Sequence, residues 1–267
     1  MDLNTVAEVT LARSRADLSL LGPTVVPLAG GSALYGEPRH NLTGLVDLMT
    51  LGWRSLTITD AGLEIAATCT VAELSRLPAQ PGWNAHPAFY QCCTAYLAGF
   101  KVWNVATIGG NLCAALPAGP MISLTSALDG EALVWRADGS EQRMPVVEFI
   151  TGNRSTVLGP GDVLRSITLP LHALHARVGF RKIALSPIGR SGLVILGRVD
   201  PDDSFVLTVT GGTVRPIRLR YDTLPGAAAL RSDVLAIAEW FSDAHGAADW
   251  RRSVGAVLAE EIREELA

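Results

Sequence analysis

The sequence predicts a mixed α+β fold of more than one domain. Strand-like and helical segments follow one another without the strict alternation of a parallel α/β sheet. A chain of 267 residues exceeds the usual length of one domain, which favours two. Its charged fraction is only 18% and its mean hydropathy is +0.27, so an intrinsically disordered chain is excluded.

The expected strands are short apolar runs bounded by turn residues, at residues 25–28, 63–66, 132–135, 167–169, 193–196 and 205–209. Asp138-Gly139 lies between two short runs and predicts a hairpin turn. Pro170 closes one strand, and a hairpin-rich stretch followed by helices comes after it. We therefore expect a first domain over residues 1–170 and a C-terminal domain over residues 171–267.

Helical signals occur in three places, and the C-terminal one predicts two helices. Thr70 and Glu73 form a capping-box pattern, which opens a short helix toward Leu77. Apolar residues at helical spacing predict an amphipathic helix over residues 250–266, with another before it over residues 234–241. A further apolar stripe predicts a helix that ends near Phe100, and its members are Phe89, Cys92, Cys93, Tyr96, Leu97 and Phe100. The two cysteines on this stripe are expected to be buried and unreactive.

Composition excludes several classes of function. The net charge is −4, and the two lysines, Lys101 and Lys182, accompany scattered arginines without a basic stripe, which argues against nucleic-acid binding. No apolar run is long enough to span a membrane and no signal-peptide pattern is present, so a cytoplasmic location is expected. The four cysteines form no CxxC pair, which predicts reduced thiols and no iron–sulfur or zinc site in this chain.

The remaining polar residues predict no catalytic group in this chain. His172 and His175 are three residues apart, but no third ligand lies near them in the sequence, so a surface pair is favoured over a metal site. The nucleophile elbow, the zinc-protease pattern and a Cys/His nucleophile pattern are all absent from the sequence.

Two Gly-Gly loops are the most informative segments. The first comprises Leu28, Ala29, Gly30, Gly31, Ser32, Ala33 and Leu34, and the second comprises Ala106, Thr107, Ile108, Gly109, Gly110, Asn111 and Leu112. A Gly-Gly pair permits positive φ and close approach of an anion, and consecutive amides can form a concavity that suits phosphate. Ser32, Thr107 and Asn111 add neutral donors.

Two such loops could clamp a diphosphate from opposite sides. Neither loop matches the GxxxxGK[ST] phosphate loop or the GxGxxG dinucleotide fingerprint, so each could also be an ordinary turn.

A specific resemblance extends over nearly the whole chain. The sequence resembles the FAD-binding, medium-size subunit of molybdenum hydroxylases, the family of xanthine dehydrogenase and carbon monoxide dehydrogenase. The segments that carry the resemblance are 29–32 (AGGS, similar to AGGT/AGGH), 104–111 (NVATIGGN, similar to RN-x-ATIGGN), 161–170, 180–182 and 245–252. The TIGGN segment is the most specific of them.

This resemblance implies a p-cresol methylhydroxylase-type FAD-binding fold of two α/β subdomains, about 1–52 and 53–170, and a small C-terminal domain of antiparallel sheet plus helices. It implies that the two Gly-Gly loops hold the FAD diphosphate, with Leu164 near the isoalloxazine ring and Lys182 or Arg181 near its polar edge. Leu97 would lie near the adenine, although it fits equally well as a plain core residue. The expected cofactor-binding set is Leu28–Leu34, Leu97, Ala106–Asn111, Leu164 and Lys182.

Four positions depart from the family pattern. Ala33 and Pro120 stand where the family commonly has aspartates, and the second of these usually holds an FAD ribose hydroxyl. Trp103 replaces the usual arginine before the second loop, and Trp250 replaces a tyrosine near the C-terminus. These departures predict that the flavin is held more weakly or differently in this chain.

The resemblance implies an FAD-dependent oxidoreductase subunit that transfers electrons within a cytoplasmic hetero-oligomer. Its partners would be a small iron–sulfur subunit with [2Fe–2S] clusters and a large molybdopterin subunit, and the acceptor would be NAD or another oxidant. Two alternatives stay open: a free-standing FAD-dependent oxidoreductase acting on a small molecule, and a scaffold subunit with a degenerate flavin site.

Overall fold

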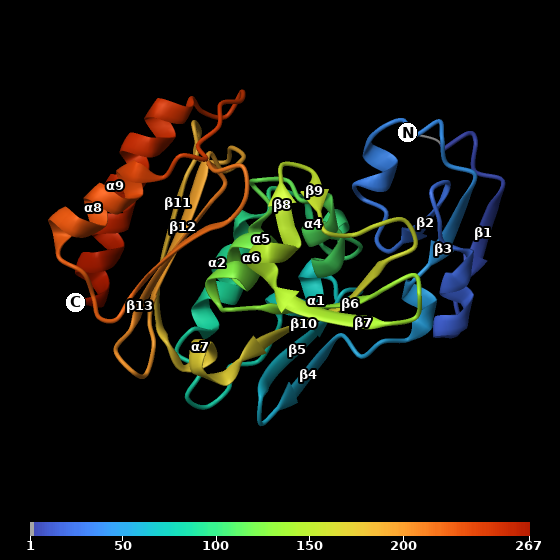
Figure 1. The fold of residues 1–267 in the computed structure, drawn as a ribbon, viewed down its shortest axis with the longest axis horizontal. Coiled ribbons are helices and arrows are strands. Elements are labelled where there is room, and N and C mark those ends of the chain that lie inside the picture. Colours follow the sequence, from blue (N-terminus) through green and yellow to red (C-terminus); the bar gives the residue numbers. More distant parts are fainter. Residues whose placement is uncertain (1–2) are drawn as a thin grey trace.

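The computed structural model describes residues 3–267, which form three successive layers of structure from the N-terminal to the C-terminal side (Figure 1). The N-terminal layer is a small parallel sheet of strand order β1-β3-β2. Its elements are β1 (Glu8–Leu11), η1 (Arg15–Leu20), β2 (Val25–Leu28), η2 (Leu34–Gly36), β3 (Gly44–Asp47) and η3 (Met49–Leu51).

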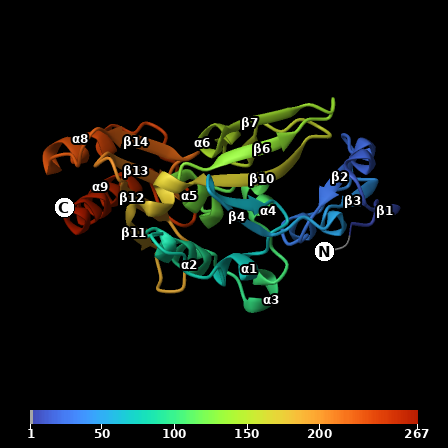
Figure 2. The same ribbon diagram turned by 90° about the horizontal axis from the view of Figure 1, so that it is seen from below.

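The central layer is a five-stranded antiparallel sheet of order β4-β5-β10-β6-β7. Its strands are β4 (Leu56–Thr59), β5 (Gly62–Ala66), β6 (Glu131–Trp135), β7 (Glu141–Pro145) and β10 (Val163–Pro170). Figure 2 shows helices α1, α2 and α3 together on one side of this sheet. The helices and the small hairpin of this layer are α1 (Val71–Ser75), α2 (His86–Ala95), α3 (Phe100–Trp103), α4 (Ile108–Ala114), α5 (Pro120–Ala127), α6 (Val146–Phe149), β8 (Ile150–Gly152) and β9 (Ser155–Thr156).

The C-terminal layer is a four-stranded antiparallel sheet of order β11-β12-β13-β14, with α8 and α9 on the side away from the central layer. Its elements are α7 (Leu171–His175), β11 (Arg177–Ile183), β12 (Leu193–Val199), β13 (Phe205–Thr210), β14 (Ile217–Tyr221), α8 (Ala227–Ala236) and α9 (Ala248–Leu266). Division of the chain into domains at residue 170 and subdomains near residue 52 stays a prediction.

Helix α5 joins the central and C-terminal layers. All eight of its residues are buried, and it packs on β12 and β13. Val194 and Leu196 of β12 belong to the same hydrophobic core as Ile65 and Leu164 of the central sheet. The amide of Gly211 also donates a hydrogen bond of 2.9 Å to the carbonyl of Pro117 across this boundary. The two layers therefore share one continuous core.

Most of the expected elements are confirmed, because each was indicated by local pattern. The predicted strands correspond to β2, β5, β6, β10, β12 and β13, and residues 136–140 form the turn between β6 and β7. The capping box is present in both directions, since Thr70 accepts from the Glu73 amide and the Glu73 carboxylate accepts from the Thr70 amide. Helix α9 matches the C-terminal prediction.

Two helix predictions are wrong. The apolar stripe does not form one helix to Phe100, because α2 ends at Ala95 and the chain turns before α3 begins. Cys92 and Cys93 are buried as expected, and burial raises the pKa of the Cys93 thiol to about 12. The helix expected over residues 234–241 instead occupies Ala227–Ala236. Within residues 3–267, no helix combines the length and apolar character needed to cross a membrane.

Candidate cofactor site

The two Gly-Gly loops meet in the structure. The first follows β2, and the second runs from the end of α3 into α4. A β-carbon added to Gly30 would lie 1.6 Å from the carbonyl oxygen of Val105, so the two backbones touch at this point. Gly31 has φ +68°, and the ring of Tyr35 packs against its α-carbon. Glycine is therefore required at both positions, at Gly30 by contact and at Gly31 by conformation as well.

The second loop is the N-terminal turn of α4 and does not have the open conformation expected from its sequence. Thr107 is the N-cap, and its hydroxyl accepts the Gly110 amide at 3.0 Å. The amides of Ile108 and Gly109 donate to the carbonyls of Cys69 and Ala67 at 2.8 and 2.9 Å.

This arrangement corrects two expectations for the second loop. Neither Gly109 nor Gly110 has positive φ, and the amides of residues 108–111 already have acceptors. Gly109 is instead needed for packing, since a β-carbon there would lie 2.4 Å from that of Ala67. Gly110 is exposed, and only Thr107 lies within reach of an added β-carbon.

The first loop supplies the available donors. Within residues 3–267, no acceptor is found for the amides of Gly30, Gly31, Ser32 and Ala33, and Ser32 is exposed. A run of unpaired amides in a glycine-containing turn suits an anionic group such as a diphosphate. The residues present therefore fit the diphosphate of a dinucleotide, with the first loop as donor and the second as a packed support.

Asn111 connects the second loop to α5. Its side-chain oxygen accepts the Met121 amide at 3.1 Å and so satisfies one of the free N–H groups at the start of α5. Among the described residues 3–267, no acceptor is found for the side-chain amide nitrogen of Asn111, so it can donate to a ligand. Pro120 occupies the first turn of α5 and is buried, a position for which proline is well suited. Residues 116–120 contain no carboxylate, so the ribose contact usual in the family has no equivalent side chain there.

The residues expected near the two ring systems of FAD lie in three different environments. Leu164 in β10 is 3% exposed and belongs to the main core. Leu97 is 58% exposed between α2 and α3, so it is not a core residue. Lys182 in β11 is half-buried, and strand alternation places it on the same face as Val178 and Phe180, which pack against the central core.

Arg181, the alternative to Lys182, faces the other way. Its guanidinium donates to Glu261 at 2.8 Å and to Glu265 at 2.6 Å, both on α9. These two carboxylates raise the pKa of the Arg181 guanidinium. Of the two residues, Lys182 is therefore the one directed toward the central layer.

Sequence reasoning missed the Glu37–Arg154 ion pair. Arg154, in the turn between β8 and β9, binds both carboxylate oxygens of Glu37 at 2.8 and 2.6 Å. Glu37 follows the first Gly-Gly loop, and the Arg154 amide donates to Ala115 at the end of α4. The pair therefore links the two sides of the candidate site. Nothing in the local sequence indicates this contact, because 117 residues separate the partners.

His172 also has neighbours that the sequence did not indicate. Asp129 and Asp200, which are distant from it in the sequence, both lie close to it in the structure. Three arginines bind Asp129, however, and one of them, Arg198, also binds Asp200, so their positive charges oppose a cation there. His172 itself is exposed, in agreement with the predicted surface position.

Comparison with solved structures shows the same fold in other chains. The reconstituted CO dehydrogenase from Oligotropha carboxidovorans aligns over 100% of both chains with a TM-score of 0.83 and 21% identity. Quinoline 2-oxidoreductase from Pseudomonas putida 86 aligns over 100% of this chain and 98% of its own, with a TM-score of 0.82 and 17% identity. The predicted α+β class and p-cresol methylhydroxylase-type fold are confirmed.

Sequence comparison identifies relatives that match only part of this chain. Xanthine dehydrogenase 2 of Arabidopsis thaliana is 29% identical over 122 residues, and the xanthine dehydrogenase of Emericella nidulans is 35% identical over 75 residues. These matches cover 43% and 28% of this chain, but only 9% and 5% of the two relatives.

The family model described as the FAD binding domain in molybdopterin dehydrogenase matches residues 4–172, well over half of the chain. That stretch contains both Gly-Gly loops, with their contact at Gly30 and the unpaired amides of the first loop. FAD as the cofactor and membership of this oxidoreductase family, both predicted from the sequence, are thereby confirmed. The chain belongs to the family of FAD-binding domains of molybdopterin dehydrogenases.

Proposed function

We propose that this chain holds FAD at the junction of its two Gly-Gly loops and serves as the flavin subunit of a molybdenum hydroxylase. The observation that carries the proposal is the run of unpaired amides at Gly30–Ala33, packed directly against the second loop. These amides hold the FAD diphosphate, and Asn111 adds a side-chain donor beside them. When bound, FAD supplies the capacity to accept and release electrons.

The chain's own residues orient the cofactor and set the charge around it. The proposed binding set is the one expected from the sequence, namely Leu28–Leu34, Leu97, Ala106–Asn111, Leu164 and Lys182. Lys182 brings a positive charge to the face of β11 that looks toward the central layer, where it stabilises negative charge on a bound ligand. Leu164 is 3% exposed and belongs to the main core, so its part in the proposed set is apolar packing rather than an open contact surface.

The proposed electron path runs between partners. An iron–sulfur subunit delivers electrons to this chain, a molybdopterin subunit oxidises the substrate, and NAD or another acceptor receives the electrons. Support comes from two exposed apolar side chains in segments close in sequence to the proposed site residues, since Phe100 is 75% exposed and Ile188 is 83% exposed. Phe100 precedes the second loop, and Ile188 follows Lys182. We propose that each contributes to a surface that binds a partner protein, as apolar surface does where it forms a contiguous patch.

Cofactor binding is tested by purifying the full chain and measuring FAD per chain by absorbance and extraction. We expect a yellow protein with one FAD per chain. A folded protein that binds no added FAD would refute the site and favour the scaffold alternative.

The electron-transfer role is tested by affinity purification from the native host with iron and molybdenum analysis. Stoichiometric iron and molybdenum in the purified complex are expected. A monodisperse monomer that oxidises a small substrate by itself would refute the role and favour the free-standing oxidoreductase.

A further inference from the structure

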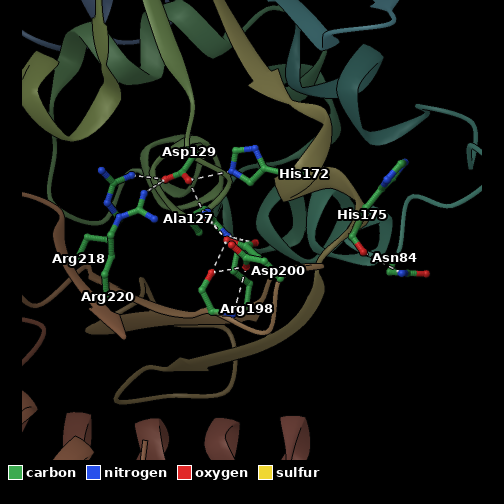
Figure 3. Close-up of polar contacts among 11 residues, drawn as sticks. Asn84, Ala127, Asp129, His172, His175, Arg198, Asp200, Arg218 and Arg220 are labelled. Carbon is green, nitrogen blue, oxygen red and sulfur yellow. Dashed lines mark hydrogen bonds and ion pairs between the residues drawn. The ribbon is translucent and has the colours of Figure 1, made fainter. Parts of the chain in front are cut away.

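Asp129 lies at the centre of a cluster of three arginines and one histidine that spans the central and C-terminal layers (Figure 3). It occupies the turn between α5 and β6. Its carboxylate binds the guanidinium groups of Arg198, Arg218 and Arg220, and the His172 ring nitrogen lies 3.2 Å from it. All four partners come from residues after Pro170, whereas Asp129 precedes it. One carboxylate therefore connects α7, β12 and β14 to the central layer.

The backbone of Asp129 is held in an uncommon conformation. Its φ is +51°, in the left-handed region that most side chains avoid. The residue in this conformation carries the carboxylate that the three arginines bind. An aspartate can adopt this conformation at modest cost, and Gly130 follows immediately. The side chain of Asp129 is 13% exposed, so its contacts are largely shielded from solvent.

Arg198 extends the connection into the core. It is 1% exposed, and it donates to the Ala127 carbonyl at the end of α5 as well as to Asp129 and Asp200. The opposite end of α5 is held by Asn111, whose side-chain oxygen accepts the Met121 amide. The helix is thus fixed at one end by the cofactor loop and at the other by the arginine cluster.

β11 is positioned through the same contacts. It pairs with β12 along its whole length, with Lys182 opposite Val194, and β12 carries Arg198 and packs on α5. Any rotation of the C-terminal sheet over α5 would move Lys182 relative to the Gly-Gly loops.

We propose that Asp129 is a positioning residue whose ion pairs fix the C-terminal sheet on α5 and thereby set where Lys182 lies relative to bound FAD. The proposal rests on the flavin site proposed above. The other ionisable groups that face the cluster are Asp200, which pairs with Arg198, Glu148, which acts on Arg218, and Asp202, which acts on His172. None of them belongs to the loops that contact FAD.

The first test is amide hydrogen exchange in the FAD-loaded full chain. Asp129→Asn keeps the size of the side chain and tolerates the left-handed backbone, but it removes the charge. We expect the Gly211 amide, which bonds to Pro117 across the boundary, to exchange at least tenfold faster, while amides within the β12–β13 ladder keep their rates. Exchange at Gly211 within twofold of the parent protein would overturn the proposal.

The second test measures the flavin midpoint potential in a double-mutant cycle. Lys182→Met should lower the potential in the parent protein, because it removes a positive charge that favours the reduced flavin. The same substitution should have less than half that effect in Asp129→Asn. A full effect in both backgrounds would show that Asp129 does not position Lys182.

Controls separate this proposal from the flavin site itself. Glu260→Gln removes the carboxylate that pairs with Arg263 on α9, and it should change neither the exchange at Gly211 nor the flavin midpoint potential. If Lys182→Met leaves the potential of the parent unchanged, the placement of Lys182 at the flavin is refuted, and the exchange at Gly211 alone decides whether Asp129 fixes the two layers. If Asp129→Asn does not fold, Arg220→Gln removes one half-exposed partner and is measured in its place.

Discussion

The α-carbon of Gly30 packs against the carbonyl group of Val105, so closely that no side chain fits between the two loops. A methyl group there would lie 1.6 Å from the carbonyl oxygen, far inside contact distance. The contact is made by backbone on both sides, so no side chain can move to relieve it.

Gly30→Ala is therefore expected to separate the loops. Overpacking of this kind destabilises proteins by roughly 1–3 kcal/mol or more, and the loss of loop contact should also abolish FAD binding. FAD titration and thermal unfolding measure the two effects. Gly36→Ala is the matched control, because nothing lies within 4 Å of a β-carbon at Gly36. Normal FAD affinity in Gly30→Ala would show that the loops need not touch.

Gly110→Val should abolish FAD binding with little loss of stability. Gly110 is exposed in the first turn of α4, so its substitution leaves the fold intact apart from strain at the Thr107 cap, whose full loss costs about 1 kcal/mol. The branched side chain would nevertheless extend from the second loop into the proposed FAD site. We expect flavin content to fall to zero with an unchanged circular dichroism spectrum. Full occupancy would mean that FAD does not approach this face of α4.

Substitutions of Asn111 can separate its structural role from cofactor binding. Asn111→Leu leaves the Met121 amide without an acceptor, which should destabilise the protein by about 1–3 kcal/mol. Asn111→Asp keeps an acceptor for this amide, so most of the stability should return. It also removes the side-chain donor and places a negative charge near the diphosphate, so FAD affinity should stay low. Equal FAD affinity in Asn111→Asp and the parent would exclude Asn111 from the site.

The stability of the protein should depend on acid pH through Asp129. Burial opposes ionisation of Asp129, but hydrogen bonding to Arg220 and the charges of Arg198 and Arg218 hold its pKa well below the ordinary value of 3.8. A pKa lowered by folding gives stability that is fully present above the unfolded-state pKa and is lost as the pH falls below it.

Urea unfolding at pH 5.5 and pH 3 therefore should show a smaller pH effect in Asp129→Asn than in the parent. Breaking a buried ion pair typically lowers the free energy of unfolding by about 3–5 kcal/mol. At pH 5.5 the loss in Asp129→Asn should be near the lower value, because Arg198 still has its ion pair with Asp200. Parallel pH dependences in the two proteins would show that Asp129 is not the responsible group.

Local sequence patterns predicted much of the fold and the position of both loops. The strands were found because apolar runs such as Leu193–Leu196 are bounded by turn residues, and the Thr70–Glu73 capping box lies within four residues. The break after Ala95 was missed because Phe100 continues the helical spacing even though the chain has already turned. Gly99 was the available signal, since it precedes α3 in an extended conformation.

Contacts between distant residues could not be predicted from spacing. Asp129 lies 69 residues from Arg198 and 91 from Arg220, and only the Asp129-Gly130 turn dipeptide hints at its left-handed backbone. The sequence predicts free amides in the second loop because Gly-Gly pairs often provide them. In the structure those amides are taken up by Cys69, Ala67 and Thr107, whose proximity depends on the packing of α4 against β5.

The burial of α5 from both sides bears on how the polypeptide can be divided. A fragment that ended at residue 172, where the family match ends, would leave α5 without the cover that β12 and β13 provide. Such a fragment should aggregate on its own, although it contains both loops. Supplied with residues 173–267 as a separate polypeptide, it should recover solubility and flavin together, as in fragment complementation. The smallest part of the chain that folds and binds FAD is then larger than the segment that carries the glycine motifs.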